Sequence, residues 1–134
     1  SGPDISPDTS CEQSVSLIDI YPTLIDLCGL PENKKLEGVS LVPQLEDSKT
    51  VRDKPAITSS YFGNHAVRSQ FWRLIAYEDG AEELYDHRSD PNEFHNLADN
   101  PRHKSIKNKL HQWLPKSEEP EFRKKSEREK RLKD

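Results

Sequence analysis

The sequence predicts an α+β fold, a four-stranded antiparallel sheet with a C-terminal amphipathic helix packed on one face. Two strand-like runs flank Asp79-Gly80, a strong hairpin signal because glycine accepts the positive φ of a tight turn. Further strand-like runs precede this pair, and an apolar stripe at helical spacing follows it. The expected strands are residues 55–61, 65–70, 73–78 and 82–87, and the expected helix is 101–114.

The first two strands are separated by a short polar loop. Pro55 leads the first run, which suits the first residue of a strand because proline cannot donate to the ladder. Gly63 and Asn64 then interrupt the β-rich pattern before His65 begins the second strand. This loop, with Tyr61, Phe62, Asn64 and His65, is the most chemically varied point of the chain.

The C-terminal helix is predicted by apolar residues at positions i, i+4, i+7 and i+8: Ile106, Leu110, Trp113 and Leu114. Asn100 fits the N-cap and Pro101 the first turn. The basic outer face is formed by Lys104, Lys107 and Lys109. We expect it to be solvated, because the neighbouring charges are mixed and no aromatic residues are interleaved for base stacking. Residues 116–134 form a charged tail, either a solvated helix or disordered.

A further helix is expected near the start of the chain, from about Ile20 to Cys28, after a 3₁₀ entry at 17–19. Pro22 requires this division, because proline is tolerated only in the first turn of a helix. The stretch Ser16-Leu-Ile-Asp19 has the pattern of a capping box. Gly29 fits the position just after the helix.

The rest of the N-terminal region is expected to be irregular apart from one helical turn. That turn is predicted at residues 42–46, around Pro43. The charged run 47–54 is expected at the surface.

Composition limits both the core and the partners of this chain. The hydrophobic fraction is 31% and the charged fraction 33%, against about 45–50% (glycine included) and 25% in ordinary globular proteins. The core must therefore be small, and a partner surface covering one face of the sheet is expected. The net charge of −4 gives no general attraction to nucleic acid or anionic membrane. No apolar run approaches the roughly 18 residues that span a bilayer.

The two cysteines and the first residue each support a separate expectation. Cys11 and Cys28 are too few for a disulfide framework and are not spaced as a metal pair. We expect two ordinary thiols, with their pairing left open. The sequence begins with Ser1 and not with an initiator methionine. We therefore expect the chain to begin inside a longer polypeptide or after a cleavage.

An ordered series of motifs resembles the C-terminal subdomain of the type I sulfatases, formylglycine-dependent sulfate ester hydrolases of the alkaline phosphatase superfamily. The matching residues are Ile18-Asp-Ile-Tyr-Pro-Thr-Leu-Ile-Asp-Leu-Cys-Gly29, Leu36-Glu-Gly-Val-Ser-Leu41, Ala66-Val-Arg68, Trp72-Arg-Leu-Ile75, Glu83-Leu-Tyr-Asp86, Asp90-Pro-Asn-Glu93 and Asn96-Leu97. Two further stretches, Gly63-Asn-His-Ala-Val-Arg68 and Tyr77-Glu-Asp-Gly80, are most similar to the bacterial iduronate-2-sulfatase-like branch.

The resemblance implies a division into three parts. Residues 1–54 would supply a connector and a helix that belongs to the larger N-terminal α/β catalytic domain, and residues 55–115 would form the C-terminal subdomain. Residues 116–134 would be the charged tail. The family uses a formylglycine made from Cys or Ser in a C/S-x-P-x-R motif, and a calcium ion held by Asp and Asn. Neither motif is present, because no arginine follows either cysteine at that spacing and no Asp-Asp pair occurs.

We therefore expect calcium and formylglycine to lie in an N-terminal catalytic portion of the same sulfatase, which would be the main partner of this chain. The chain alone is expected to be inactive, with no catalytic residue, metal or cofactor of its own. The whole enzyme would hydrolyse a sulfate ester, with a sulfated carbohydrate as the expected substrate, and the resemblance implies a periplasmic or secreted location.

The preferred substrate-binding residues are Asn64, His65 and Arg68. An amide and an imidazole can donate hydrogen bonds to a sulfate, a carboxylate or a sugar hydroxyl, and in the family, loops of this subdomain line one wall of the substrate cleft. The alternative is that His65 is a strand-entry residue packed against the helix. Arg68 fits either substrate binding or pairing with a buried acid.

Other polar residues are interpreted as structural. Tyr85, Asp86 and Asp90 are expected to determine the fold, with Asp90 accepting backbone hydrogen bonds in the turn fixed by Pro91. A metal cluster of Asp86, His87, Asp90 and His95 is the less favoured reading. Trp72 and Trp113 are expected in the core or at a domain interface. Two other functions stay open, a phosphodiesterase or phosphatase of the same superfamily and a non-catalytic sugar-binding module.

Overall fold

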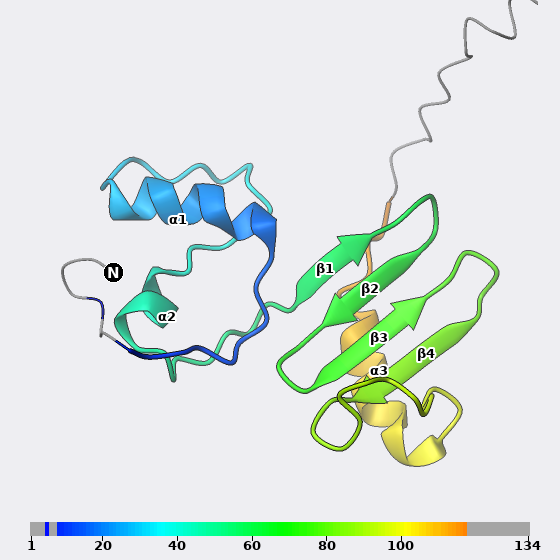
Figure 1. Ribbon diagram of the computed structural model, residues 1–134. Coiled ribbons are helices and arrows are strands. Elements are labelled where there is room, and N and C mark those ends of the chain that lie inside the picture. The colour runs from blue at the N-terminus through cyan, green and yellow to red at the C-terminus, as the bar shows by residue number, and fades with distance from the viewer. Residues whose placement is uncertain (1–4, 6–7, 118–134) are drawn as a thin grey trace, which may run out of the picture.

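A computed structural model describes residue 5 and residues 8–117 of the chain, and it confirms the α+β fold (Figure 1). A four-stranded antiparallel sheet has α3 on one face, and a smaller helical region precedes it. The elements are η1 (Leu17–Asp19), α1 (Ile20–Leu27), α2 (Val42–Glu46), β1 (Ala56–Ser59), β2 (His65–Arg68), β3 (Trp72–Ala76), β4 (Glu82–Asp86), η2 (Pro101–His103) and α3 (Lys104–His111). Within these residues, no helix has the length and apolar character needed to cross a membrane.

The sheet is a simple meander in the order β1-β2-β3-β4. Gly80 makes the predicted β3–β4 turn with φ of 86°, and the Tyr77 amide donates to the Ala81 carbonyl at 3.0 Å. The predicted first strand is too long, because Tyr61 has φ of 60°, a left-handed conformation that no strand accommodates. The other predicted strands overrun their ends by one or two residues, where the chain enters tight turns.

The core is a row of side chains crossing the sheet. Val67, Leu74 and Leu84 are neighbours in register on β2, β3 and β4, and all three are completely buried. Leu110 of α3 and Ala98, from the loop that follows β4, complete the cluster, so the helix covers one face as expected. Partly buried apolar residues surround it: Trp72, Leu97, Ile106 and Leu114.

The predicted C-terminal helix is divided into η2 and α3 and ends earlier than residue 114. The Asn100 side chain accepts a hydrogen bond from the Arg102 amide at 3.1 Å, which confirms the expected cap. Trp113, beyond the end of α3, is 39% exposed and is therefore not a core residue. Apart from Lys116 and Ser117, the predicted charged tail lies outside the described residues.

The N-terminal region contains the expected 3₁₀ entry, the helix α1 and the short α2. Gly29 follows α1 with φ of 62°, as expected for the residue after a helix. The Ser16 amide donates to the Asp19 carboxylate at 2.8 Å, which forms the acidic half of the capping box. Cys11 and Cys28 are exposed free thiols.

One prediction for this region is wrong, because the charged run 47–54 is not all at the surface. The side chain of Arg52 is only 5% exposed and lies 2.7 Å from the carboxylate of Asp19, which is 1% exposed. Asp19 also accepts the Val39 amide at 2.9 Å. The ion pair, together with a hydrogen bond from Arg52 Nε to the Lys54 carbonyl at 2.8 Å, offsets part of the cost of removing the arginine charge from water.

Candidate functional site

The sheet has one face covered by α3 and one open face (Figure 1). Side chains alternate between the two faces along each strand, so the residues that share a parity with Val67 face the helix. The opposite parity places the following residues on the open face: Ala66, Arg68, Arg73, Ile75, Glu83 and Tyr85.

A hollow of about 400 Å³ lies on the open face at the end where the β1–β2 loop meets the β3–β4 hairpin. Its wall includes Asn64 from the loop, Ile75 and Arg73 from β3, and the tyrosines Tyr61 and Tyr77. Tyr61 is 89% exposed. The hollow thus combines aromatic surface with an amide and a guanidinium, a combination that suits a sugar carrying an anionic group.

Asn64 holds the loop in place. Its side-chain amide donates to the Phe62 carbonyl at 3.0 Å, and its oxygen accepts the Glu78 amide at 3.4 Å. The approach between the loop and the hairpin is close, because a Cβ on Gly63 would lie 2.7 Å from the Glu78 Cβ. Gly63 also has φ of 74°, so the position suits glycine on both counts.

His65 lies on the other face of the sheet. It has the parity of Val67, is only 8% exposed, and its Nδ1 lies 2.8 Å from the Ser59 hydroxyl on β1. This placement corresponds to the structural alternative for His65, a strand-entry residue on the side of the helix. His65 also contributes to the lining of the hollow, but its ring nitrogen is engaged by Ser59 of β1.

Arg68 lies at the opposite end of β2 from Asn64 and His65. It occupies the open face between Ala56 of β1 and Arg73 of β3. The three residues predicted for substrate binding are therefore only partly gathered. Asn64 and His65 both line the hollow, whereas Arg68 lies at the far end of β2.

Polar residues that are distant in the sequence, and whose contact was not predicted, form a network on the open face. One Arg73 nitrogen donates to both oxygens of Glu93, at 3.1 and 3.0 Å. Nε2 of His87 lies 2.7 Å from the same carboxylate. Glu93 belongs to the Asp90-Pro-Asn-Glu93 motif, but nothing local in the sequence indicates that it reaches across to β3.

A second acid, Glu83, organises two tyrosines. The Tyr85 hydroxyl donates to it at 2.7 Å and the Tyr77 hydroxyl at 3.1 Å. The hydrogen bond to Glu83, together with burial, raises the pKa of Tyr85 to about 12. Burial and the same acid also raise the pKa of Tyr77. Both phenols are therefore neutral hydrogen-bond donors at neutral pH and neither is poised as a base.

The four residues of the less favoured metal cluster do not converge on one point, although His95 Nδ1 lies 3.7 Å from the Asp90 carboxylate. Asp86 pairs with Arg88 at 2.6 Å, and His87 pairs with Glu93. Asp90 accepts the amides of Phe94 and His95 at 3.0 and 2.8 Å, hydrogen bonds that lower its pKa. Its expected role in the turn is thus confirmed. The described part of the chain contains no group of three or more His, Cys, Asp or Glu residues that could hold a metal ion.

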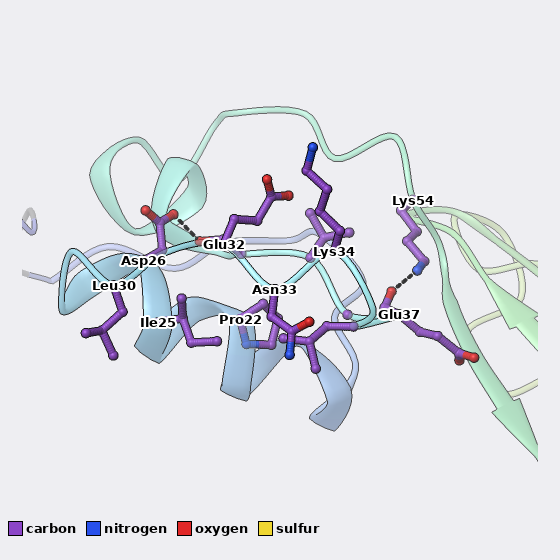
Figure 2. Close-up of a pocket in the computed structure, with 13 residues that line it drawn as sticks. Pro22, Ile25, Asp26, Leu30, Glu32, Asn33, Lys34, Glu37 and Lys54 are labelled. Carbon is purple, nitrogen blue, oxygen red and sulfur yellow. Dashed lines mark hydrogen bonds between the residues drawn. The ribbon is translucent and has the colours of Figure 1, made fainter.

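A larger hollow of about 630 Å³ lies in the N-terminal region, between α1 and the following loop (Figure 2). Ile25 and Leu30 contribute apolar surface, and Lys34 and Glu32 contribute charges of opposite sign. At its edge the Lys54 ammonium contacts the Glu37 carbonyl. The mixed charges give this hollow no preference for an anionic or a cationic ligand.

Comparison with known proteins decides the family. The family profile described as "N-sulphoglucosamine sulphohydrolase, C-terminal" matches residues 2–120. The chain belongs to this family of sulfatase C-terminal domains. The resemblance predicted from the ordered motifs is thereby confirmed.

Two relatives show how much of a sulfatase this domain represents. A protein named "Sulfatase" from Formosa agariphila is 40% identical over 116 residues, which are 87% of this chain and 23% of the relative. "Arylsulfatase K" of Bos taurus is 36% identical over 112 residues, which are 72% of this chain and 21% of the relative. The sulfatase C-terminal domain described here thus spans between a fifth and a quarter of these relatives.

Solved structures of sulfatases share the fold. A 2-O GAG sulfatase has a TM-score of 0.66 at 28% identity, over 85% of this chain and 27% of that one. A structure in complex with its substrate, D-glucosamine-2-N,6-O-disulfate, has a TM-score of 0.59 at 28% identity, over 72% and 22% of the two chains. A phosphonate monoester hydrolase from Silicibacter pomeroyi, with a TM-score of 0.60 at 21% identity over 84% and 26%, shares the fold alone. The iduronate-2-sulfatase-like subtype stays a prediction.

Proposed function

We propose that the whole protein hydrolyses sulfate esters of a sulfated carbohydrate, and that the sulfatase C-terminal domain completes its fold and forms one wall of its substrate cleft. The observation that carries the proposal is the family match over residues 2–120. Two solved neighbours support a sugar substrate, because one is a 2-O GAG sulfatase and the other is in complex with its substrate, D-glucosamine-2-N,6-O-disulfate.

The chemistry is assigned to the remaining portion of the polypeptide. Formylglycine and calcium would supply the nucleophile and the charge stabilisation there. The residues of this chain are assigned to binding and orienting the substrate, because the hollow beside Asn64 combines aromatic surface with an amide and a guanidinium.

The wall of the cleft is assigned to the hollow beside Asn64. Tyr61 and Tyr77 offer apolar ring surface for a sugar, and Arg73 is the cation that borders the same hollow. His65 acts as a positioning residue, since its bond to Ser59 joins β1 to β2 directly behind the loop. This proposal keeps Asn64 in contact with substrate and gives His65 an indirect role.

Residues 1–54 are assigned to the interface with the catalytic portion. Five apolar residues of η1 and α1 are each at least half exposed: Leu17 (84%), Ile20 (51%), Tyr21 (58%), Leu24 (53%) and Leu27 (55%). A contiguous apolar stripe of this kind marks a contact surface. We assign the stripe to a groove on the larger domain, which is also where the resemblance to the family places it.

The second candidate function is hydrolysis of a phosphate or phosphonate ester, because a phosphonate monoester hydrolase shares the fold. The protein sequence that precedes Ser1 separates the two. A C/S-x-P-x-R motif selects a sulfatase, whereas an unmodified Thr or Ser nucleophile with ligands for two zinc ions selects the alternative. A non-catalytic sugar-binding module would instead bind sugars without any such motif.

The experiment compares full-length enzyme variants on two substrates, a sulfated disaccharide and a small aryl sulfate. Asn64→Ala is expected to lower kcat/KM about tenfold on the disaccharide, because one hydrogen bond to the sugar is worth roughly 1.4 kcal/mol, and to leave the aryl sulfate nearly unchanged. Asn108→Ala, at an exposed position of α3, is the matched control. Equal losses on both substrates would contradict a role in binding the sugar.

A further inference from the structure

The open face of the sheet contains a cationic group whose hydrogen-bonding capacity is not met within the described chain. Nη1 of Arg68 is buried and has no hydrogen-bond partner among the described residues. Leaving a buried donor without an acceptor is unfavourable, and more so for a charged group. Burial lowers the pKa of Arg68, and the nearby Arg73 acts in the same direction against Glu93.

The acids that approach this face are already engaged. Both oxygens of Glu93 accept hydrogen bonds from Arg73, and one of them also lies 2.7 Å from His87. Glu83 accepts the hydroxyl groups of Tyr77 and Tyr85. Arg68 therefore adds a positive charge to a surface whose carboxylates already have other partners.

The surroundings of Arg68 favour an ion pair that excludes water. Ala56 and Ala66 flank it on the open face with Ile75 beyond, and its cross-strand neighbour on β3 is a second cation, Arg73. Small apolar neighbours leave room for an incoming side chain, and the guanidinium can bind a carboxylate through two parallel hydrogen bonds.

We propose that the open face is covered by the remaining portion of the same polypeptide, which places an aspartate or glutamate carboxylate against Arg68. The inference rests on the proposed function, because it takes the covering chain to be the catalytic portion of the sulfatase. Relatives contain about four times as much chain as is described here, so the covering segment has an evident source. Arg73, the cross-strand neighbour of Arg68, also lines the hollow, so a segment that contacts Arg68 would border the hollow there and leave Asn64, Tyr61 and Tyr77 open to substrate.

Zero-length cross-linking in the full-length enzyme tests the proposal. R68K places an amine where a water-soluble carbodiimide can join it to a touching carboxylate, and peptide mass spectrometry identifies the linked residue. R88K is the matched control, because Arg88 already pairs with Asp86 at 2.6 Å and should give a link inside this chain. We expect the R68K enzyme to give a link to an Asp or Glu outside residues 1–134.

A link from R68K to Glu83 or Glu93, no link while the R88K control succeeds, or a link between two isotopically distinguished copies would each overturn the proposal. A neutral variant gives a second test that does not depend on cross-linking. R68M is expected to lower the urea midpoint of the full-length enzyme and to leave KM within twofold, with R102M, an exposed position, as control. A raised KM with an unchanged midpoint would instead place Arg68 against substrate.

These outcomes are separable from the proposed function. If the unaltered full-length enzyme failed to hydrolyse any sulfate ester, the proposed function would fall, whereas the R68K link would still identify the segment that covers the sheet.

Discussion

The two regions of this chain are stabilised in opposite ways. In the sheet region the fully buried side chains are Val67, Leu74 and Leu84, which form an apolar row under α3. In the N-terminal region the large side chain that is fully buried is that of Asp19, an acid. The first region has a closed apolar core of its own, whereas the second is joined by polar contacts and leaves the apolar residues of its helix exposed.

This difference indicates which region depends on a partner. The helix α1 has only eight residues, too few to be stable without packing against something else. Asp19 and Thr23 attach it to the following chain, since the Thr23 hydroxyl donates to the Asp19 carbonyl at 2.6 Å and accepts the Leu41 amide at 2.9 Å. The helix is thus held in place from one side, and we propose that its exposed apolar stripe is covered in the complete protein.

The largest effect is expected from breaking the buried ion pair. Asp19→Ala should destabilise the complete protein by about 3–5 kcal/mol, because it leaves Arg52 buried without its partner and removes the acceptor for the Ser16 and Val39 amides. Asp26→Ala, which removes an exposed carboxylate bonded to the Ser40 hydroxyl, should cost less than about 1 kcal/mol. Urea unfolding measures both, and similar costs would show that the network is not what holds this region.

A pair of leucine truncations compares the two regions directly. Leu74→Ala should cost about 2–5 kcal/mol, as expected for a cavity in a closed core. Leu24→Ala removes a side chain that is 53% exposed here. In the complete protein it should still cost clearly more than the 0.5 kcal/mol typical of surface sites, because we place it at the interface.

If thermal or urea unfolding of the complete protein shows a Leu24→Ala effect within about 0.5 kcal/mol, the apolar stripe is a solvent-exposed surface and the comparison loses its explanation.

The sheet region could be predicted largely because its signals are local. The Asp79-Gly80 turn and the apolar spacing in 101–114 each depend on a few neighbouring residues. The face occupied by His65 could also have been predicted, because His65 lies two residues before the core residue Val67 on the same strand and must share its face. A substrate-binding role outward from the sheet is less compatible with that parity.

The interactions that prediction missed join residues far apart in the sequence. Asp19 and Arg52 are 33 positions apart, and a run of charged residues is normally solvated, so nothing local marked Arg52 as buried. Arg73 and Glu93 are 20 positions apart. Only the tertiary arrangement brings such pairs together, which is why periodicity and turn chemistry predicted strands and helices but not the polar network.

Two glycine substitutions test how closely the N-terminal region is packed. A Cβ on Gly38 would lie 2.0 Å from the Ile18 carbonyl oxygen, whereas a Cβ on Gly29 meets no atom within 4 Å. Gly38→Ala should therefore cost about 1–3 kcal/mol through backbone displacement. Gly29→Ala should cost about 1 kcal/mol from its positive φ alone. Thermal unfolding that ranks the two in reverse order would contradict the close approach of the loop to η1.

The pH dependence of Asp19 is expected to be the smallest effect near neutrality. Burial raises the pKa of this carboxyl, but hydrogen bonds from Val39 and Ser16 and the charge of Arg52 outweigh it, so the pKa is lowered. A lowered pKa contributes stability above the unfolded value of about 3.9, and this stability is lost as the pH falls through the folded value.

Urea midpoints measured from pH 7 down to pH 3 should therefore fall more steeply for the unaltered protein than for Asp19→Asn, with the difference confined to the region below about pH 4. A difference centred near neutral pH would contradict this assignment.

The central claim, that the N-terminal stripe is covered in the complete protein, is tested most directly by hydroxyl-radical footprinting of two tyrosines. Tyr21 is 58% exposed in the chain described here, and Tyr85 is 7% exposed. We expect Tyr21 of the folded full-length enzyme to be protected to a degree similar to Tyr85, each relative to the urea-unfolded enzyme. Modification of Tyr21 at the rate of the unfolded enzyme, with Tyr85 protected, would contradict the account.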